Sequence, residues 1–169
     1  SGATSTAPVK TFQKAFANAL ATEELTIVAA TAGTYTASGV TVPSIKSITI
    51  TSASNLLNTN VILQRVDANT RELFQLQSTS IGRLTFANIS IASPKDLSID
   101  ASLATRIGRL EFSNVRFTHA AQGTTDYSLT GLFLRVVNAE QVFMSDCTFS
   151  GKTLNLRAAF VIVATQRVE

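Results

Sequence analysis

Three stretches decide the fold of this chain: Leu84-Thr-Phe-Ala-Asn-Ile-Ser-Ile91, Leu110-Glu-Phe-Ser-Asn-Val-Arg-Phe117 and Val142-Phe-Met-Ser-Asp-Cys-Thr-Phe149. Each follows the pattern apolar-x-apolar-small-Asn/Asp-apolar-x-apolar, and the copies start 26 and 32 residues apart. A repeated unit of this length buries its apolar face only against neighbouring units. The repeat therefore predicts a solenoid of short strands.

Each copy changes phase at its fifth residue. Apolar residues alternate on both sides of this point, as in a β-strand, but the alternation shifts by one residue across it. The residue at the shift is Asn88, Asn114 or Asp146. Because Asn and Asp tolerate left-handed backbone, we expect a bend here and a column of these three residues in stacked coils. Beyond the first bend, the pattern points Ser90 outward.

Further apolar segments extend the strand pattern along the chain. Strands are expected at Thr26–Ala29, Ser47–Thr51, Val61–Gln64, Leu73–Gln77, Leu132–Val136 and Ala159–Val163. Hydrophobic residues make up 45% of the chain, and the abundant Val, Ile, Thr and Phe favour strands. We therefore expect an all-β solenoid of about five coils, the first and last incomplete.

An amphipathic helix is expected before the first strand, over residues 9–22. Apolar side chains recur at helical spacing at Val9, Phe12, Phe16 and Leu20. Ser5 or Thr6 is expected to cap the helix. Such a helix would cover the open apolar end of the first coil. The alternative is a helix that binds a partner or a membrane surface.

One domain is expected over residues 9–169, with the coils at 25–169. Residues 1–8, which open on Ser-Gly, are interpreted as a cloning remnant and leader. No run of about 18 apolar residues occurs, so no membrane span is expected in this segment. The C-terminal apolar strand has no capping helix after it. We expect that the protein continues beyond Glu169, or that another chain pairs with this strand.

The order of these segments is similar to that of a known family. The likeness is carried by the helix Thr11–Leu20, by Leu25-Thr-Ile-Val28, by Ala32-Gly-Thr-Tyr-Thr36 and by the repeat at Leu84–Ile91. The chain resembles the N-terminal part of right-handed parallel β-helix proteins of the pectin-lyase-like superfamily. Within it, the chain looks like the non-enzymatic passengers of bacterial surface adhesins (autotransporter-type) and of chlamydial polymorphic outer membrane proteins. It lacks the Gly-Gly-Ala-Ile box of the chlamydial group.

The resemblance implies a right-handed parallel β-helix from a cell-surface or secreted, extracellular protein. It further implies a non-catalytic adhesive or structural scaffold whose loops bind a host or cell-surface protein or a glycan. A second hypothesis is a polysaccharide lyase or hydrolase of the pectin-lyase-like type. A third is a self-assembling fibre or surface-layer module that associates through its C-terminal strand.

Residues suited to catalysis are sparse. Enzymes of the superfamily use clustered acids, often with calcium, whereas the 11 acidic residues here are scattered. General acid-base chemistry needs two groups held on one surface. Glu111 with Asp96 or Asp100 is the best candidate pair, and no catalytic residue is assigned.

Two arginines occupy equivalent positions in a repeated Ile-Gly-Arg-Leu motif. Arg83 and Arg109 should therefore form a small basic column, which Gln141 would continue and to which Arg116 and Arg135 could add. Such a column would bind acidic glycans or phosphates. The alternative is ordinary ion pairing with Glu111, Glu72 or Glu140. A formal net charge of +3 without a row of aromatic residues argues against nucleic-acid binding.

The single cysteine and single histidine exclude the usual zinc patterns. Cys147 falls on an inward position and is interpreted as a small core residue. His119 follows the second repeat in an expected turn and has no cluster of Cys or acidic residues around it. No metal and no cofactor are therefore expected.

A Gly- and Thr-containing segment at 119–130 is the most suggestive loop. It brings together His119, Asp126 and Tyr127, which could bind a sugar. Loops that vary in length between coils often carry the binding surface of a solenoid. The alternative is a solvated loop without a ligand.

Overall fold

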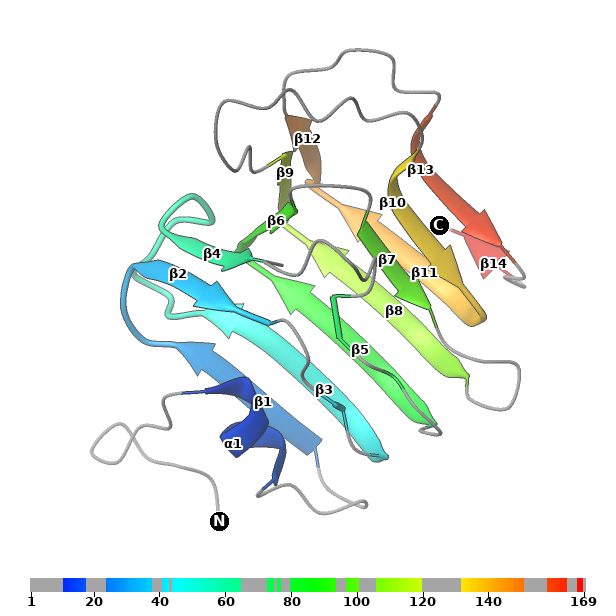
Figure 1. Cartoon of the computed structure of the whole chain (residues 1–169), viewed down its shortest axis with the longest axis horizontal. Coiled ribbons are helices and arrows are strands. Elements are labelled where there is room, and N and C mark those ends of the chain that lie inside the picture. Colours follow the sequence, from blue (N-terminus) through cyan, green and yellow to red (C-terminus); the bar gives the residue numbers. More distant parts are fainter. Residues whose placement is uncertain are drawn as a thin grey trace.

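Parallel β-strands and one short helix make up the structure, a computed structural model (Figure 1). It describes residues 11–17, 24–37, 41–42, 44–64, 73–74, 76, 80–93, 97–100, 106–119, 132–150, 158–163 and 167–168. The expected all-β class with parallel pairing is confirmed, because every strand pair of the three sheets is parallel.

The described strands form three sheets, and in each sheet they follow chain order. The six-stranded sheet contains β1 (Glu24–Ala29), β3 (Ile45–Ser52), β5 (Ile81–Ala87), β8 (Ile107–Ser113), β11 (Ala139–Ser145) and β14 (Arg167–Val168). The five-stranded sheet contains β2 (Gly33–Thr36), β4 (Val61–Gln64), β6 (Ser90–Ser93), β9 (Arg116–His119) and β12 (Thr148–Ser150). The three-stranded sheet contains β7 (Leu97–Asp100), β10 (Leu132–Val137) and β13 (Ala158–Val163).

The chain visits these sheets in turn. In the six-stranded sheet, each strand up to β11 is followed by strands of the other sheets before the chain returns. We use the word level for such a strand together with those that follow it. The third level, for example, is β5, β6 and β7, and the fourth is β8, β9 and β10. Successive levels therefore pair strand against equivalent strand, as Figure 1 shows for β3, β5, β8 and β11.

The pairing is in register with the sequence repeat. Leu84 of β5 lies beside Leu110 of β8, and Phe86 lies beside Phe112. Since alternate residues of a strand face opposite sides of its sheet, these columns all point inward, and their side chains are buried. The apolar alternation of the sequence thus becomes a continuous core running across the levels.

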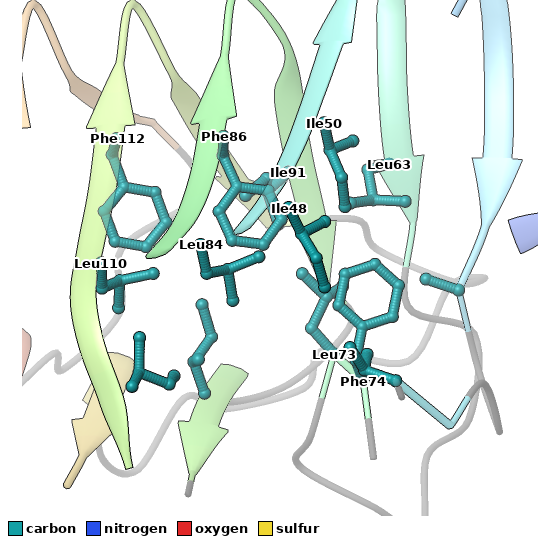
Figure 2. Close-up of a cluster of buried hydrophobic side chains, with 14 of the residues drawn as sticks. Ile48, Ile50, Leu63, Leu73, Phe74, Leu84, Phe86, Ile91, Leu110 and Phe112 are labelled. Carbon is teal, nitrogen blue, oxygen red and sulfur yellow. The ribbon is translucent and has the colours of Figure 1, made fainter. Parts of the chain in front are cut away.

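Stacked phenylalanine rings run through this core (Figure 2). The ring of Phe86 lies nearly parallel to that of Phe112, with centroids 5.4 Å apart, and on its other side it stacks on Phe74 at 6.3 Å. Phe12 and Phe16 of the helix α1 (Phe12–Ala17) meet Phe74 edge-on at 5.7 and 5.8 Å. The helix therefore packs into the core through aromatic contacts at the N-terminal end of the levels.

The helix begins later than expected. α1 starts at Phe12, and the hydroxyl of Thr11 accepts a hydrogen bond from the Lys14 backbone N–H at 3.2 Å. Thr11 is thus the residue that caps this helix, in place of the expected Ser5 or Thr6. The other expected helical residues, Val9 and Leu20 among them, lie outside the described residues.

One expected strand is corrected, and one outward residue proves to be covered. Leu73 and Phe74 form bends, although both are buried, so the expected strand at Leu73–Gln77 is wrong for these two residues. Ser90 alternates with the buried Ile91 and so lies on the expected outward side of β6, but it is only 3% exposed. Its hydroxyl donates to the carbonyl of Asn58 at 2.9 Å, so a segment remote in sequence covers it.

Replacing a stacked core ring should lower the stability of the fold. Phe112 is buried between Phe86 and Phe117, so we expect Phe112→Ala to lower the free energy of unfolding by about 3–5 kcal/mol, measured by urea denaturation. Phe143→Ala is the matched control, because Phe143 lies on a half-exposed face, and it should cost much less. Equal losses for the two variants would contradict the stacked core.

Candidate functional site

The bend positions of the repeat have left-handed backbone. The φ angles are 52° at Asn88, 52° at Asn114 and 54° at Asp146. Each bend lies between a strand of the six-stranded sheet and the following strand of the five-stranded sheet. Sequence reasoning missed one further bend at Asn138, whose φ is 58° and which joins β10 to β11. Its only signal was an Asn between two apolar runs.

Side-chain amides connect the bends of successive levels. The Asn114 Nδ2 donates to Oδ1 of Asn88 at 2.8 Å. The Asn88 Nδ2 in turn donates to the Ser52 hydroxyl at 2.6 Å and to the Leu56 carbonyl at 2.8 Å. The Ser52 hydroxyl donates to the Asn88 carbonyl at 2.7 Å. An amide both donates and accepts, so this ladder satisfies polar groups at a corner that strand pairing leaves open.

The ladder changes character at the fifth level. A carboxylate has no N–H donor, so Asp146 cannot continue the amide bonds that run from Asn114 to Asn88. The Asn114 Oδ1 instead accepts from Nδ2 of Asn58 at 2.9 Å. Asn58 therefore supplies the donor that Asp146, the bend residue of the fifth level, lacks.

The two arginines share one register position on the outer face of the six-stranded sheet. Arg83 of β5 lies beside Arg109 of β8, with Ser47 of β3 before them and Gln141 of β11 after them. Adjacent strands lie about 4.8 Å apart, so the two guanidinium groups belong to one surface. The neighbouring outward column is formed by Thr26, Thr49, Thr85, Glu111 and Phe143.

The surroundings of the two arginines differ. Arg109 forms an ion pair with Glu111, and its guanidinium carbon lies 3.9 Å from the centre of the Phe143 ring. The other carboxylate oxygen of Glu111 accepts from the Thr85 hydroxyl at 3.0 Å. Arg83 is exposed and forms no ion pair with any described residue. Sequence reasoning missed Phe143, whose place beside Arg109 follows only from the register.

The other candidate residues are not brought together with this column. Arg116 lies in β9 and Arg135 in β10, which belong to the other two sheets, so the expectation that these two arginines add to the column is wrong. His119 is the last residue of β9, paired with Ser93, and does not lie in a turn. Glu111 and Asp100 also lie in different sheets.

Three further candidate residues lie in parts of the chain that the structure does not describe. Asp96, Asp126 and Tyr127 lie outside the described residues. Among the described residues, no group of three or more His, Cys, Asp or Glu side chains is arranged to hold a metal ion. Within the same part of the chain, no helix has the length and apolarity to cross a membrane.

Cys147 packs partly against the core, next to the bend of the fifth level at Asp146. Burial raises the pKa of its thiol, hydrogen bonds with backbone groups of Val115 and Ser145 oppose the rise, and the Asp146 carboxylate adds to it. Because the thiolate is the reactive form, the Cys147 side chain is a poor nucleophile here.

The Asn88 side chain and the left-handed backbone at Asn88 both affect stability, and two substitutions should separate their contributions. Asn88→Ala loses the amide hydrogen bonds and places Cβ in left-handed backbone, which costs about 1–2 kcal/mol beyond the lost bonds. Asn88→Gly loses the same bonds without that backbone cost. Urea denaturation should therefore rank stability as wild type, then Gly, then Ala. Ala and Gly variants of equal stability would contradict a backbone contribution.

The thiol of Cys147 should react slowly in the folded protein. Its raised pKa leaves less thiolate at pH 8 than an unfolded cysteine has, and the side chain is partly covered. We expect iodoacetamide to alkylate the folded chain several-fold more slowly than the chain in urea, followed by mass spectrometry. Equal rates would contradict the burial.

Comparison of the chain with protein-family models, with curated proteins and with solved structures gave no match.

Proposed function

We propose that this chain is a non-catalytic, right-handed parallel β-helix scaffold of a cell-surface or secreted protein, of the adhesin-passenger kind. Its ligand is an acidic glycan of the cell surface, bound on the outer face of the six-stranded sheet. The scaffold part of the proposal is supported by parallel sheets whose strands recur in chain order and by left-handed bends between them. These features suit a chain that coils with equivalent strands stacked.

The alignment of Arg83 with Arg109 carries the binding part of the proposal. Like charges side by side on a sheet repel each other, and Glu111 neutralises only Arg109. A carboxylate or sulfate of a ligand would relieve the remaining charge through a charge-assisted hydrogen bond to Arg83. The Thr85 and Gln141 side chains next to the arginines supply hydrogen-bonding groups for sugar hydroxyls, and Phe143 supplies an apolar surface.

Calorimetric titration with an oligogalacturonate hexamer at low salt tests this proposal. We expect Arg83→Gln to weaken binding at least about tenfold and added salt to weaken it further. Arg106→Gln is the matched control, because Arg106 is exposed, pairs with Glu140 and precedes β8. Its affinity should stay close to that of the wild type. Unchanged binding by Arg83→Gln, or equal losses in the two variants, would overturn the proposed face.

The same samples separate the two other functions. Glu111 shares the outer face with both arginines, which is the observation that favours a lyase or hydrolase. Release of unsaturated or shortened sugars, lost in Glu111→Gln, would support that enzyme. β13 pairs only with β10 among the described strands, which favours self-association through an open edge. A discrete dimer or trimer in light scattering would support an assembly module.

A further inference from the structure

One connection between sheets extends beyond its own level. The segment Ala53–Asn60, here called the strap, links β3 to β4 within the second level. Its own turns brace it: the N–H of Leu56 donates to the Ala53 carbonyl at 3.0 Å, and the N–H of Asn60 donates to the Leu57 carbonyl at 2.9 Å. The Leu57 N–H also donates to Oδ1 of Asn60 at 2.9 Å.

Asn58 of the strap contacts two later levels at once. Its Nδ2 reaches the bend of the fourth level, where it lies 2.9 Å from Oδ1 and 3.3 Å from the carbonyl oxygen of Asn114. Its carbonyl accepts the hydroxyl of Ser90, in β6 of the third level, at 2.9 Å. These partners are 56 and 32 residues away in sequence. One residue thus ties three levels together.

A second residue of the strap strengthens the tie. The carbonyl of Leu56 accepts Nδ2 of Asn88 at 2.8 Å, and the Leu56 side chain packs against the core. Ser90 is buried, so its hydroxyl depends on the strap for its described hydrogen bond. A buried polar group that loses its only partner is costly, so displacement of the strap would destabilise the third level directly.

The outward side of the strap takes no part in these contacts. Leu57 is 69% exposed, and Asn55 is exposed and forms no hydrogen bond with a described residue. The strap therefore has an inner side built from Leu56 and Asn58 and an outer side open to solvent. This division supplies control variants within the same eight-residue segment.

We propose that the strap is a clasp that fastens the second level to the third and fourth, so that the bends at Asn88 and Asn114 open together. Without the clasp, the bends keep the Asn114–Asn88 side-chain bond and the bonds between Asn88 and Ser52. They also keep backbone bonds to the next level, from the Asn88 N–H to the Ser113 carbonyl and from the Asn114 N–H to the Ser145 carbonyl, both 2.9 Å. The clasp couples these two local openings because Asn58 bonds Asn114 through its side chain and Ser90 through its carbonyl, so displacement of the strap breaks both bonds.

Native-state hydrogen exchange of the whole chain, read at single amides by NMR, tests this proposal. In the wild type, the Asn88 and Asn114 amides should exchange with similar protection, through one shared opening. Asn58→Ala removes the side-chain bonds to Asn114 and keeps the carbonyl that accepts from Ser90. In this variant the Asn114 amide should exchange at least about tenfold faster than in the wild type, and its protection should diverge from that of the Asn88 amide. Asn55→Ala and Leu57→Ala should leave both amides as they are in the wild type.

Ser90→Ala gives an independent reading if Asn58→Ala does not fold. It removes the Ser90–Asn58 bond and leaves the Asn88–Leu56 bond to the strap, so it should accelerate exchange at Asn88 more than at Asn114. Equal exchange in Asn58→Ala and Asn55→Ala would overturn the clasp. So would wild-type exchange at both amides in Ser90→Ala.

Discussion

In-register parallel pairing between levels is the constraint on which the rest of this structure depends. It places each residue beside its counterpart in the next repeat, so that Leu84 meets Leu110 and Phe86 meets Phe112. A side chain that suits the interior at one level must therefore suit it again at the next. Stacked rings satisfy this requirement, because flat aromatic faces pack on one another across the spacing of paired strands.

The same constraint acts differently at the corner and on the outer face. At the corner, like residues help each other, because one amide donates to the next while accepting from another, as Asn114 does with Asn88 and Asn58. On the outer face, like residues oppose each other, because Arg83 and Arg109 carry the same charge. Glu111 offsets one of the two charges from within the chain. The second charge is the feature from which a function is proposed.

Sequence periodicity located most of the elements but few of their partners. The phase shift of the repeat coincides with left-handed backbone at Asn88, Asn114 and Asp146, because only a few residue types tolerate that conformation. The same periodicity did not reveal that Ser90 is covered, since alternation reports which side of a strand a residue occupies and not what covers that side. It also predicted that Arg116 extends the arginine column, although Arg116 follows a bend and lies in another sheet.

The amino-acid sequence by itself determined the all-β class, the positions of the bends and the inward columns, because these depend on local patterns of apolar residues and on backbone tolerance. Only the tertiary structure decided that Phe143 lies beside Arg109 and that Glu111 pairs with it. It also decided that Asn58 bonds to Asn114, which lies 56 residues away in the sequence. These contacts depend on register and on the path of one loop, which no local pattern encodes.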